Sequence, residues 1–224
     1  YITKPISPAI VRARVKTHLS LVQAEQLKLA HVDLVHRLGC AAEYKDTDTG
    51  EHIVRMSKYS KILALAYGMT EQHAELLKQA APMHDIGKIG IPDAILLKPG
   101  KLTAEEFEHM KQHAKIGAKI LANSSSPLLQ LAYILAMEHH EKWDGSGYPN
   151  GLKGEEISIE GRIVAIADVF DALTSKRPYK QAWSVDEAIS HMREQAGKHF
   201  DPQLIALFEG QLDAVLAVYS AYQG

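Results

Sequence analysis

The sequence predicts an all-α protein, a helical bundle with a metal cluster in its core and a connecting helix at its N-terminus. Strict alternation of apolar and polar residues, the pattern of a strand, is nearly absent after residue 6. Apolar residues recur instead at three- and four-residue spacing, between capping residues and Gly- or Pro-containing breaks. The length of 224 residues suits one substantial domain plus an appendage.

The connecting helix is expected to begin near Ser7-Pro8, where serine can cap a helix and proline suits its first position. Residues 12–43 are helix-permissive, with no Pro and Gly39 as the one glycine, so this helix continues into the main domain. A short strand before Ser7 would not be stable alone. Lys4-Pro5 resembles the end of the last strand of a response-regulator receiver domain; a cloning remnant or an ordinary N-terminal helix is the alternative.

The helices of the main domain are delimited by clear start and stop signals. Gly68 suits a helix end, Thr103 with Glu106 has the spacing of a capping box, and Ser184 can cap a helix. The expected helices span 52–67, 70–84, 103–121, 127–141, 160–174 and 184–197, with a last one opened by Asp201-Pro202. Glycine- and proline-rich loops are expected over 86–104, 143–158 and 177–183.

Composition limits the class of protein. A net charge of -2 gives no field that would gather a nucleic acid polymer or an anionic membrane, so we predict neither as a partner. The single cysteine, Cys40, excludes an intrachain disulfide. No apolar run approaches the roughly 18–20 residues of a membrane span, and Tyr1 to Pro8 does not look like a signal peptide. We therefore expect a cytoplasmic protein.

Metal-type residues carry most of the functional information. Two adjacent pairs, His84-Asp85 and His139-His140, stand among single residues of the same kind. The single residues are Asp48, His52, His113, Asp168 and Asp171. Imidazole and carboxylate together suit a borderline divalent cation, and this set is too large for one ion. Clusters of two or three such ions split phosphate esters.

Each part of this set has an ordinary alternative. His84-Asp85 could be a histidine at a helix end beside a surface aspartate. Asp168 and Asp171 lie at i and i+3 on one helical face. That face could be solvated, but its neighbours are apolar, and an aspartate buried there must be paired or bound to metal.

Six motifs in order resemble the HD-GYP family, a subgroup of the HD phosphohydrolases that hydrolyse the bacterial second messenger cyclic di-GMP. They are DTGEH (48–52), HDIGK (84–88), QHAKIG (112–117), HHEKWDGSGYP (139–149), ADVFDALTS (167–175) and RPYK (177–180). The resemblance runs from about residue 40 to the low 200s and implies the HD-superfamily helical fold. The domains expected are a receiver-like remnant (1–20), a connecting helix (21–43) and an HD-GYP domain (44–224).

The resemblance also implies ligand roles. The ligands of two ions would be His52, His84, Asp85, His113, His139, His140 and Asp168. Positions Asp48 and Asp171 accompany a third ion in the family, although members of that class usually carry Glu where this chain has Asp48. Two or three ions are therefore expected, with iron or manganese favoured and nickel or zinc as alternatives.

These residues predict attack on a phosphodiester by a metal-bridged hydroxide, with Asp85 as the bridging carboxylate. Lys88, one turn past His84, could meet a phosphate or steady the hydroxide, although it could also be a surface lysine. The resemblance supports Arg177 and Lys180 as phosphate clamps, and Tyr148 could stack on the substrate or donate a hydrogen bond to it.

The predicted activity is hydrolysis of cyclic di-GMP to pGpG, with either pGpG or GMP as the final product, controlled by a receiver domain. One alternative is a catalytically silent cyclic di-GMP receptor, and another is an HD-superfamily enzyme acting on a related cyclic dinucleotide. The resemblance also suggests docking on diguanylate cyclases (GGDEF proteins). The apolar seam of the N-terminal helix predicts a homodimer.

Overall fold

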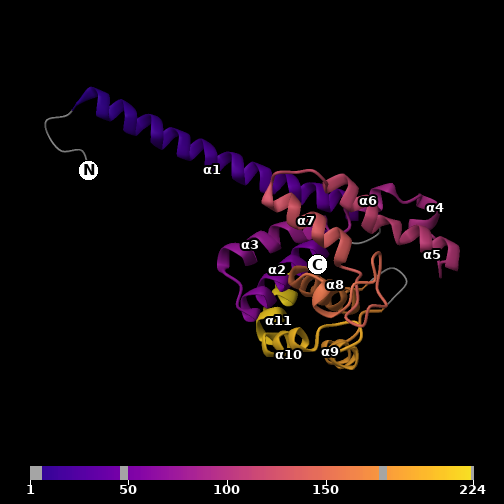
Figure 1. The fold of residues 1–224 in the computed structure, drawn as a ribbon. Helices are drawn as coiled ribbons and strands as arrows, with labels where there is room; N and C mark the ends of the chain where they lie inside the picture. Colours follow the sequence, from indigo (N-terminus) through magenta and orange to yellow (C-terminus); the bar gives the residue numbers. More distant parts are fainter. Residues whose placement is uncertain (1–6, 46–49, 177–180, 223–224) are drawn as a thin grey trace.

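The described part of the protein, residues 7–45, 50–176 and 181–222 of a computed structural model, is built from helices (Figure 1). Within these ranges the only β-type pairing is an isolated bridge between Ala196 and Phe200. The predicted all-α class is therefore confirmed. The α-helices are α1 (Pro8–Glu43), α2 (Gly50–Tyr67), α3 (Glu71–Ala80), α4 (Asp93–Leu96), α5 (Ala104–Met110), α6 (Gln112–Leu121), α7 (Pro127–Glu138), α8 (Ile159–Thr174), α9 (Val185–Glu194), α10 (Pro202–Gly210) and α11 (Leu212–Ala221). Short 3-10 helices are η1 (Ala81–Met83), η2 (Ile86–Gly90) and η3 (Gly154–Glu156).

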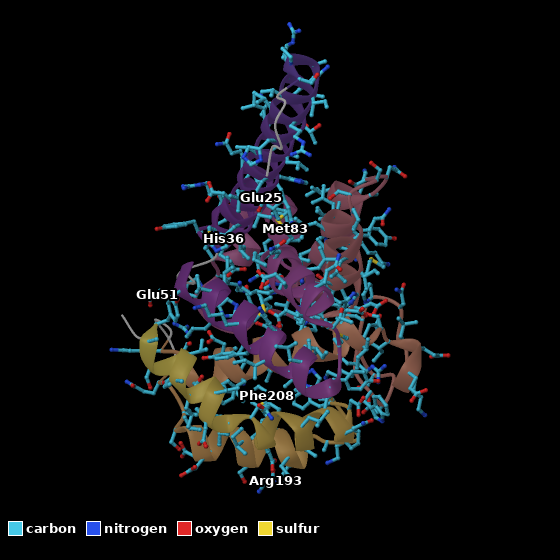
Figure 2. All side chains as sticks on the ribbon, turned by 90° about the vertical axis from the view of Figure 1, so that its left-hand side faces the viewer. Glu25, His36, Glu51, Met83, Arg193 and Phe208 are labelled. Atoms are coloured by element: carbon cyan, nitrogen blue, oxygen red, sulfur yellow. The ribbon has the colours of Figure 1, made fainter. Side chains whose placement is uncertain are left out.

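Helix α1 projects away from the body for most of its length (Figures 1 and 2). Side chains around Glu25 point into solvent, and only the C-terminal turns, with Val35 and Ala42, are buried. Gly39 allows this contact, because a Cβ at Gly39 would lie 2.5 Å from the carbonyl oxygen of Pro82. The glycine thus brings the end of α1 against η1.

Helix α2 lies at the centre of the body, against α3, α8, α10 and α11. Its Tyr59 meets Phe170 of α8 edge-on at a centroid distance of 5.5 Å, and Phe170 meets Phe208 of α10 at 5.1 Å. Phe208 is labelled in Figure 2, between the C-terminal helices and α2. Burying three such rings stabilises the fold by several kcal/mol, at roughly 1.5–3 kcal/mol for each fully buried large apolar side chain. This aromatic row fixes α8 against α2.

The contact between η2 and α6 is unusually close because two glycines face each other. A Cβ at Gly87 would lie 1.8 Å from the carbonyl oxygen of His113 and 2.5 Å from the backbone nitrogen of Gly117. No other residue fits at Gly87 without moving backbone. The segment that carries His84 and Asp85 is thereby held against the helix that carries His113.

The structure interrupts two helices that the sequence predicted as continuous. The helix expected over 103–121 breaks at Lys111 into α5 and α6, and Gln211 separates α10 from α11. The loop expected over 86–104 contains η2 and α4. No proline stands at Lys111 or Gln211, so packing decides that the chain turns at these two breaks. The receiver-like strand expected before Ser7 lies outside the described residues.

Among the described residues, no single helix is both long and apolar enough to cross a membrane. Helices α10 and α11 reach that length and composition only when taken together, and they are bent by 68° at the break between them.

Candidate metal centre

The helices bring seven of the predicted ligands together. His52 comes from α2, His84 and Asp85 from the junction of η1 and η2, and His113 from α6. His139 caps α7, His140 follows it, and Asp168 comes from α8. Their ligand atoms form two groups, within each of which all atoms lie within 4.8 Å of one another. We call these the His84 position (His52, His84 and Asp168) and the His113 position (His113, His139, His140 and Asp85).

Four of the imidazoles are held in the same tautomer. Nδ1 of His84, His113 and His139 lies 2.9, 2.7 and 2.9 Å from the carbonyl oxygens of Ala81, Met110 and Leu135 respectively. Nδ1 of His52 lies 2.8 Å from a carboxylate oxygen of Asp171. An Nδ1 that donates to an oxygen leaves Nε2 with a free lone pair, which is the arrangement of metal-ligating histidines.

Asp85 faces both positions. Its Oδ1 lies 3.2 Å from Nε2 of His113 and 3.4 Å from Nε2 of His139. Its Oδ2 lies 3.3 Å from Nε2 of His84 and 2.8 Å from Nζ of Lys88. One carboxylate oxygen therefore serves each position, as a bridging ligand requires.

The inward-facing atoms fit divalent cations. Nε2 of His84 and Oδ1 of Asp85 are buried and have no hydrogen-bond partner among the described residues. Nε2 of His113 and Nε2 of His139 face each other at 3.3 Å although both rings already donate through Nδ1. Two lone pairs so close repel unless a cation lies beside them. The donor set, imidazole with carboxylate, suits a borderline divalent ion.

The protonation states suit metal binding at the His113 position, whereas His84 carries a proton that an ion would have to replace. Burial lowers the pKa of His113 to about 4 and holds that of His140 well below its usual value, so both rings are neutral at neutral pH. Burial raises the pKa of Asp85, but Lys88 and His84 outweigh it and hold that pKa well below the usual range. Burial lowers the pKa of His84, yet the Asp85 carboxylate raises it to about 9. A metal ion at His84 would therefore have to displace this proton.

Asp171 lies behind His52 and outside both positions. Its Oδ1 accepts from Nε of Arg55 at 2.6 Å, and its Oδ2 accepts from His52 and from Nη2 of Arg55, both at 2.8 Å. A carboxylate on the outer nitrogen of a ligating histidine orients that ring. The predicted role of Asp171 as a ligand of a third ion stays a prediction, while its contacts are those of an orienting group.

Five of the metal-type residues line a cavity of about 230 Å³: His52, Asp85, His113, His140 and Asp168. Lys88 and Tyr148 line the same cavity, with the Nζ of Lys88 beside Asp85. The Tyr148 ring lies 4.7 Å from that of His140 and 6.3 Å from that of Phe107. Lys111 lies over the Tyr148 ring, with its Nζ 5.6 Å from the centroid. The volume is below the roughly 300–1,000 Å³ of common ligand pockets.

Three predicted site residues, Asp48, Arg177 and Lys180, lie outside the described residues. Sequence reasoning missed Glu43, which joins His84 and Asp85 in a third set of close ligand atoms. The sequence did offer one signal for Glu43, its position at the end of a predicted helix. A carboxylate there interacts unfavourably with the helix dipole.

Comparison with known families decides the relationship. The family model described as HD domain matches residues 21–204. The chain belongs to the HD domain family. This HD domain carries the HD-GYP motifs in order, and its similarity to named cyclic di-GMP phosphodiesterases supports the HD-GYP assignment.

Three curated relatives illustrate that similarity. The cyclic di-GMP phosphodiesterase response regulator RpfG of Xanthomonas campestris pv. campestris is 43% identical over 98% of this chain and 64% of its own length. A cyclic di-GMP phosphodiesterase of Thermotoga maritima is 50% identical over 79% of this chain and 48% of its own length. The 3'3'-cGAMP-specific phosphodiesterase 2 of Vibrio cholerae is 47% identical over 83% and 36%. The HD domain chain thus spans about half the length of these relatives.

Solved structures share the fold. A cyclic GMP-AMP-specific phosphodiesterase of V. cholerae (V-cGAP3) aligns with a TM-score of 0.63 at 20% identity, over 86% of this chain and 51% of its own. The HD domain of L. monocytogenes PgpH, solved with cyclic-di-AMP, aligns with a TM-score of 0.53 at 20% identity, over 84% and 98%. At this identity they establish the HD-domain fold of this chain.

Proposed function

We propose that this chain is a phosphodiesterase that hydrolyses cyclic di-GMP with two or three divalent metal ions, iron or manganese in preference to nickel or zinc. One observation carries the proposal. Two groups of ligand atoms share Asp85 at a cavity that Lys88 and Tyr148 also line. We propose cyclic di-GMP as the substrate because the relatives from X. campestris and T. maritima are named as cyclic di-GMP phosphodiesterases.

Each position would hold one ion. His52, His84 and Asp168 would bind the first, and His113, His139 and His140 the second, with Asp85 between them. Paired ions, when bound, acidify water to provide the nucleophile and neutralise phosphate charge. Asp48 is proposed as a ligand of a third ion, from the family resemblance.

Lys88 and Tyr148 would bind the phosphate itself. The ammonium of Lys88 lies against Asp85, where it can donate to a non-bridging phosphate oxygen as a point charge. Burial raises the pKa of Tyr148, so its hydroxyl keeps its proton and can donate a hydrogen bond to an anion. Arg177 and Lys180 are proposed as further phosphate contacts from the resemblance.

Cleavage of one phosphodiester of the ring gives pGpG, and cleavage of the second gives GMP. The relative named as specific for 3'3'-cGAMP makes that dinucleotide the second candidate substrate. Loss of a metal ligand or of Tyr148 would signal a silent receptor, and all of these residues are present in this chain.

The test is product analysis after anaerobic reconstitution with Fe²⁺ or Mn²⁺. We expect pGpG or GMP from cyclic di-GMP, with slower turnover of 3'3'-cGAMP. Asp85→Asn should abolish turnover, while Asp213→Asn, an exposed aspartate of α11, should leave it unchanged. A fully metallated protein that binds cyclic di-GMP without cleaving it would instead identify a receptor.

Helix α1 is proposed to form a homodimer. Val15, Leu19, Val22 and Leu29 are exposed and follow heptad spacing on α1, the pattern of a coiled-coil seam. Sedimentation analysis should find a dimer that Leu19→Glu dissociates. A parent protein that sediments as a monomer at high concentration would refute this.

Control by a receiver domain is proposed from the relative named as a response regulator, whose similarity extends over 98% of this chain. A phosphoryl mimic on the full-length protein should change its phosphodiesterase rate, and unchanged kinetics would refute the idea.

Docking on GGDEF proteins is proposed for the glycine-rich loop of residues 143–151. Substitution of Ser146 by Trp in this loop should weaken binding to a purified diguanylate cyclase. Equal binding by the parent and the variant would exclude the loop as the contact.

A further inference from the structure

Glu43 is a buried carboxylate outside every motif that the sequence indicated. It is the last residue of α1 and is 1% exposed. Neither of its carboxylate oxygens has a hydrogen-bond partner in the described part of the chain. Nζ of Lys88 forms a long ion pair with Glu43 at 3.6 Å, beyond hydrogen-bond distance, and lies closer to Asp85, at 2.8 Å, so one ammonium is shared between two carboxylates. A carboxylate buried in this way is unfavourable unless a cation compensates it.

The position of Glu43 in its helix adds to that cost. The C-terminal end of a helix carries partial negative charge, which disfavours a carboxylate there. The last turn of α1 contains no basic residue that would offset the charge. A divalent cation next to Glu43 would compensate both its burial and its unfavourable place in the helix.

The geometry provides a place for this cation. A carboxylate oxygen of Glu43, Nε2 of His84 and a carboxylate oxygen of Asp85 all lie within 4.8 Å of one another. Nε2 of His84 has a single lone pair and can bind one ion, which is the ion that His52 and Asp168 also face. We infer that Glu43 is a further ligand of the ion at the His84 position. The inference rests on the metal binding that the proposed function requires, and not on the identity of the substrate.

With Glu43 included, the two positions differ in chemistry. The His84 position has three carboxylates and two imidazoles, from Glu43, Asp85, Asp168, His52 and His84. The His113 position has three imidazoles and shares the single carboxylate of Asp85. Carboxylate-rich sites favour Mn²⁺, whereas imidazole suits zinc and iron. Mn²⁺ should therefore prefer the His84 position.

As a metal ligand, Glu43 would also connect α1 to the metal centre. The last turns of α1 rest on η1 through Gly39 and Pro82, and η1 leads directly to His84. An ion that binds Glu43 and His84 together would hold the end of the projecting helix in place. Ion binding should therefore reduce amide hydrogen exchange in residues 35–45.

The experiment is a titration of metal-free protein with Mn²⁺ alone, counted by electron paramagnetic resonance of the free ion. Glu43→Gln should raise the Kd of one ion at least about tenfold and leave the other ion unchanged, because a ligand changes affinity at least as much as the 10–100-fold typical of outer-shell partners. Glu141→Gln is the matched control. Glu141 is also a buried carboxylate, at 2% exposed, but it accepts from the backbone nitrogens of Asn150 and Leu152.

Lys88→Met separates the ligand role from a simple ion pair. If Glu43 is a ligand, Lys88→Met keeps both Mn²⁺ sites while Glu43→Gln weakens one, and Mn²⁺ protects residues 35–45 from exchange only when Glu43 is present. If Glu43→Gln binds Mn²⁺ as the parent does, the inference is overturned and the proposed function stands. A parent protein that binds no metal would overturn both.

Discussion

Asp171→Asn is the substitution that tests how the metal centre is supported. Asp171 is fully buried and accepts hydrogen bonds from His52 and from two nitrogens of Arg55, at 2.6–2.8 Å. Ser175 donates to it at 3.1 Å. An asparagine of the same size presents an amide group, and therefore hydrogen-bond donors, to partners that are themselves donors.

The magnitude follows from these contacts. Arg55 is 5% exposed, so removal of Asp171 leaves its buried charge with only Glu51, a half-exposed carboxylate 3.7 Å from Nη1, as a charged partner among the described residues. Breaking a buried pair in this way costs about 3–5 kcal/mol of stability. His52 also loses the acceptor that fixes its tautomer, which should weaken metal binding by about 10–100-fold. Because Asp171 is an orienting group in this structure, the full complement of metal should return at saturating concentration.

Denaturant unfolding of the metal-free protein and metal titration measure the two effects separately. The double variant Arg55→Met with Asp171→Asn should recover part of the lost stability, since no charge is then buried alone, but it should not recover metal affinity. Two results would refute the reasoning. One is a stability loss below about 1 kcal/mol. The other is a metal count that stays one ion short at saturation, which would make Asp171 a ligand itself.

Three further predictions concern packing, pH and substrate contact. Gly87→Ala should destabilise the fold by at least about 1–3 kcal/mol, because its Cβ would collide with the backbone of α6. Gly50→Ala is the control and should leave the unfolding midpoint nearly unchanged, because the space around its Cβ is open. Equal unfolding midpoints for the two variants would contradict the packing argument. Burial lowers the pKa of His199 to about 4 in the folded protein, whereas a histidine in the unfolded chain has a pKa of roughly 6.5. The unfolded state therefore binds the proton first as the pH falls. The free energy of unfolding should decrease between pH 6.5 and 4, by at most about 3 kcal/mol. His199→Gln should weaken this pH dependence between pH 6.5 and 4, as measured by denaturant unfolding at each pH. Parallel curves for the parent protein and the variant would exclude His199 as the titrating group. Tyr148→Phe should lower kcat/KM on cyclic di-GMP by about 10–100-fold, the loss expected for a hydrogen bond to a charged group, with the metal count unchanged; full activity would remove Tyr148 from the phosphate contacts.

The sequence alone determined the class of the fold and the chemistry of its centre. Helix starts depend on residues only a few positions apart, so the sequence predicted the capping box of Thr103 with Glu106 and the cap at Ser184. The structure confirms both, and Ser184 forms a capping box with Glu187. The adjacent pairs His84-Asp85 and His139-His140 could also be recognised from the sequence, because two such pairs in one chain are unusual among ordinary surface residues.

Only the tertiary structure decided which of these side chains contact one another. Asp168 and Asp171 share one helical face, yet Asp168 points to the ligand atoms and Asp171 to Arg55, a residue 116 positions away in the chain. Glu43 belongs to no motif and reaches the centre only because Gly39 lets α1 rest on η1. Periodicity and capping are local properties that a sequence records directly. The distance between two side chains from distant segments depends on how every helix between them packs, and that is settled only in the folded bundle.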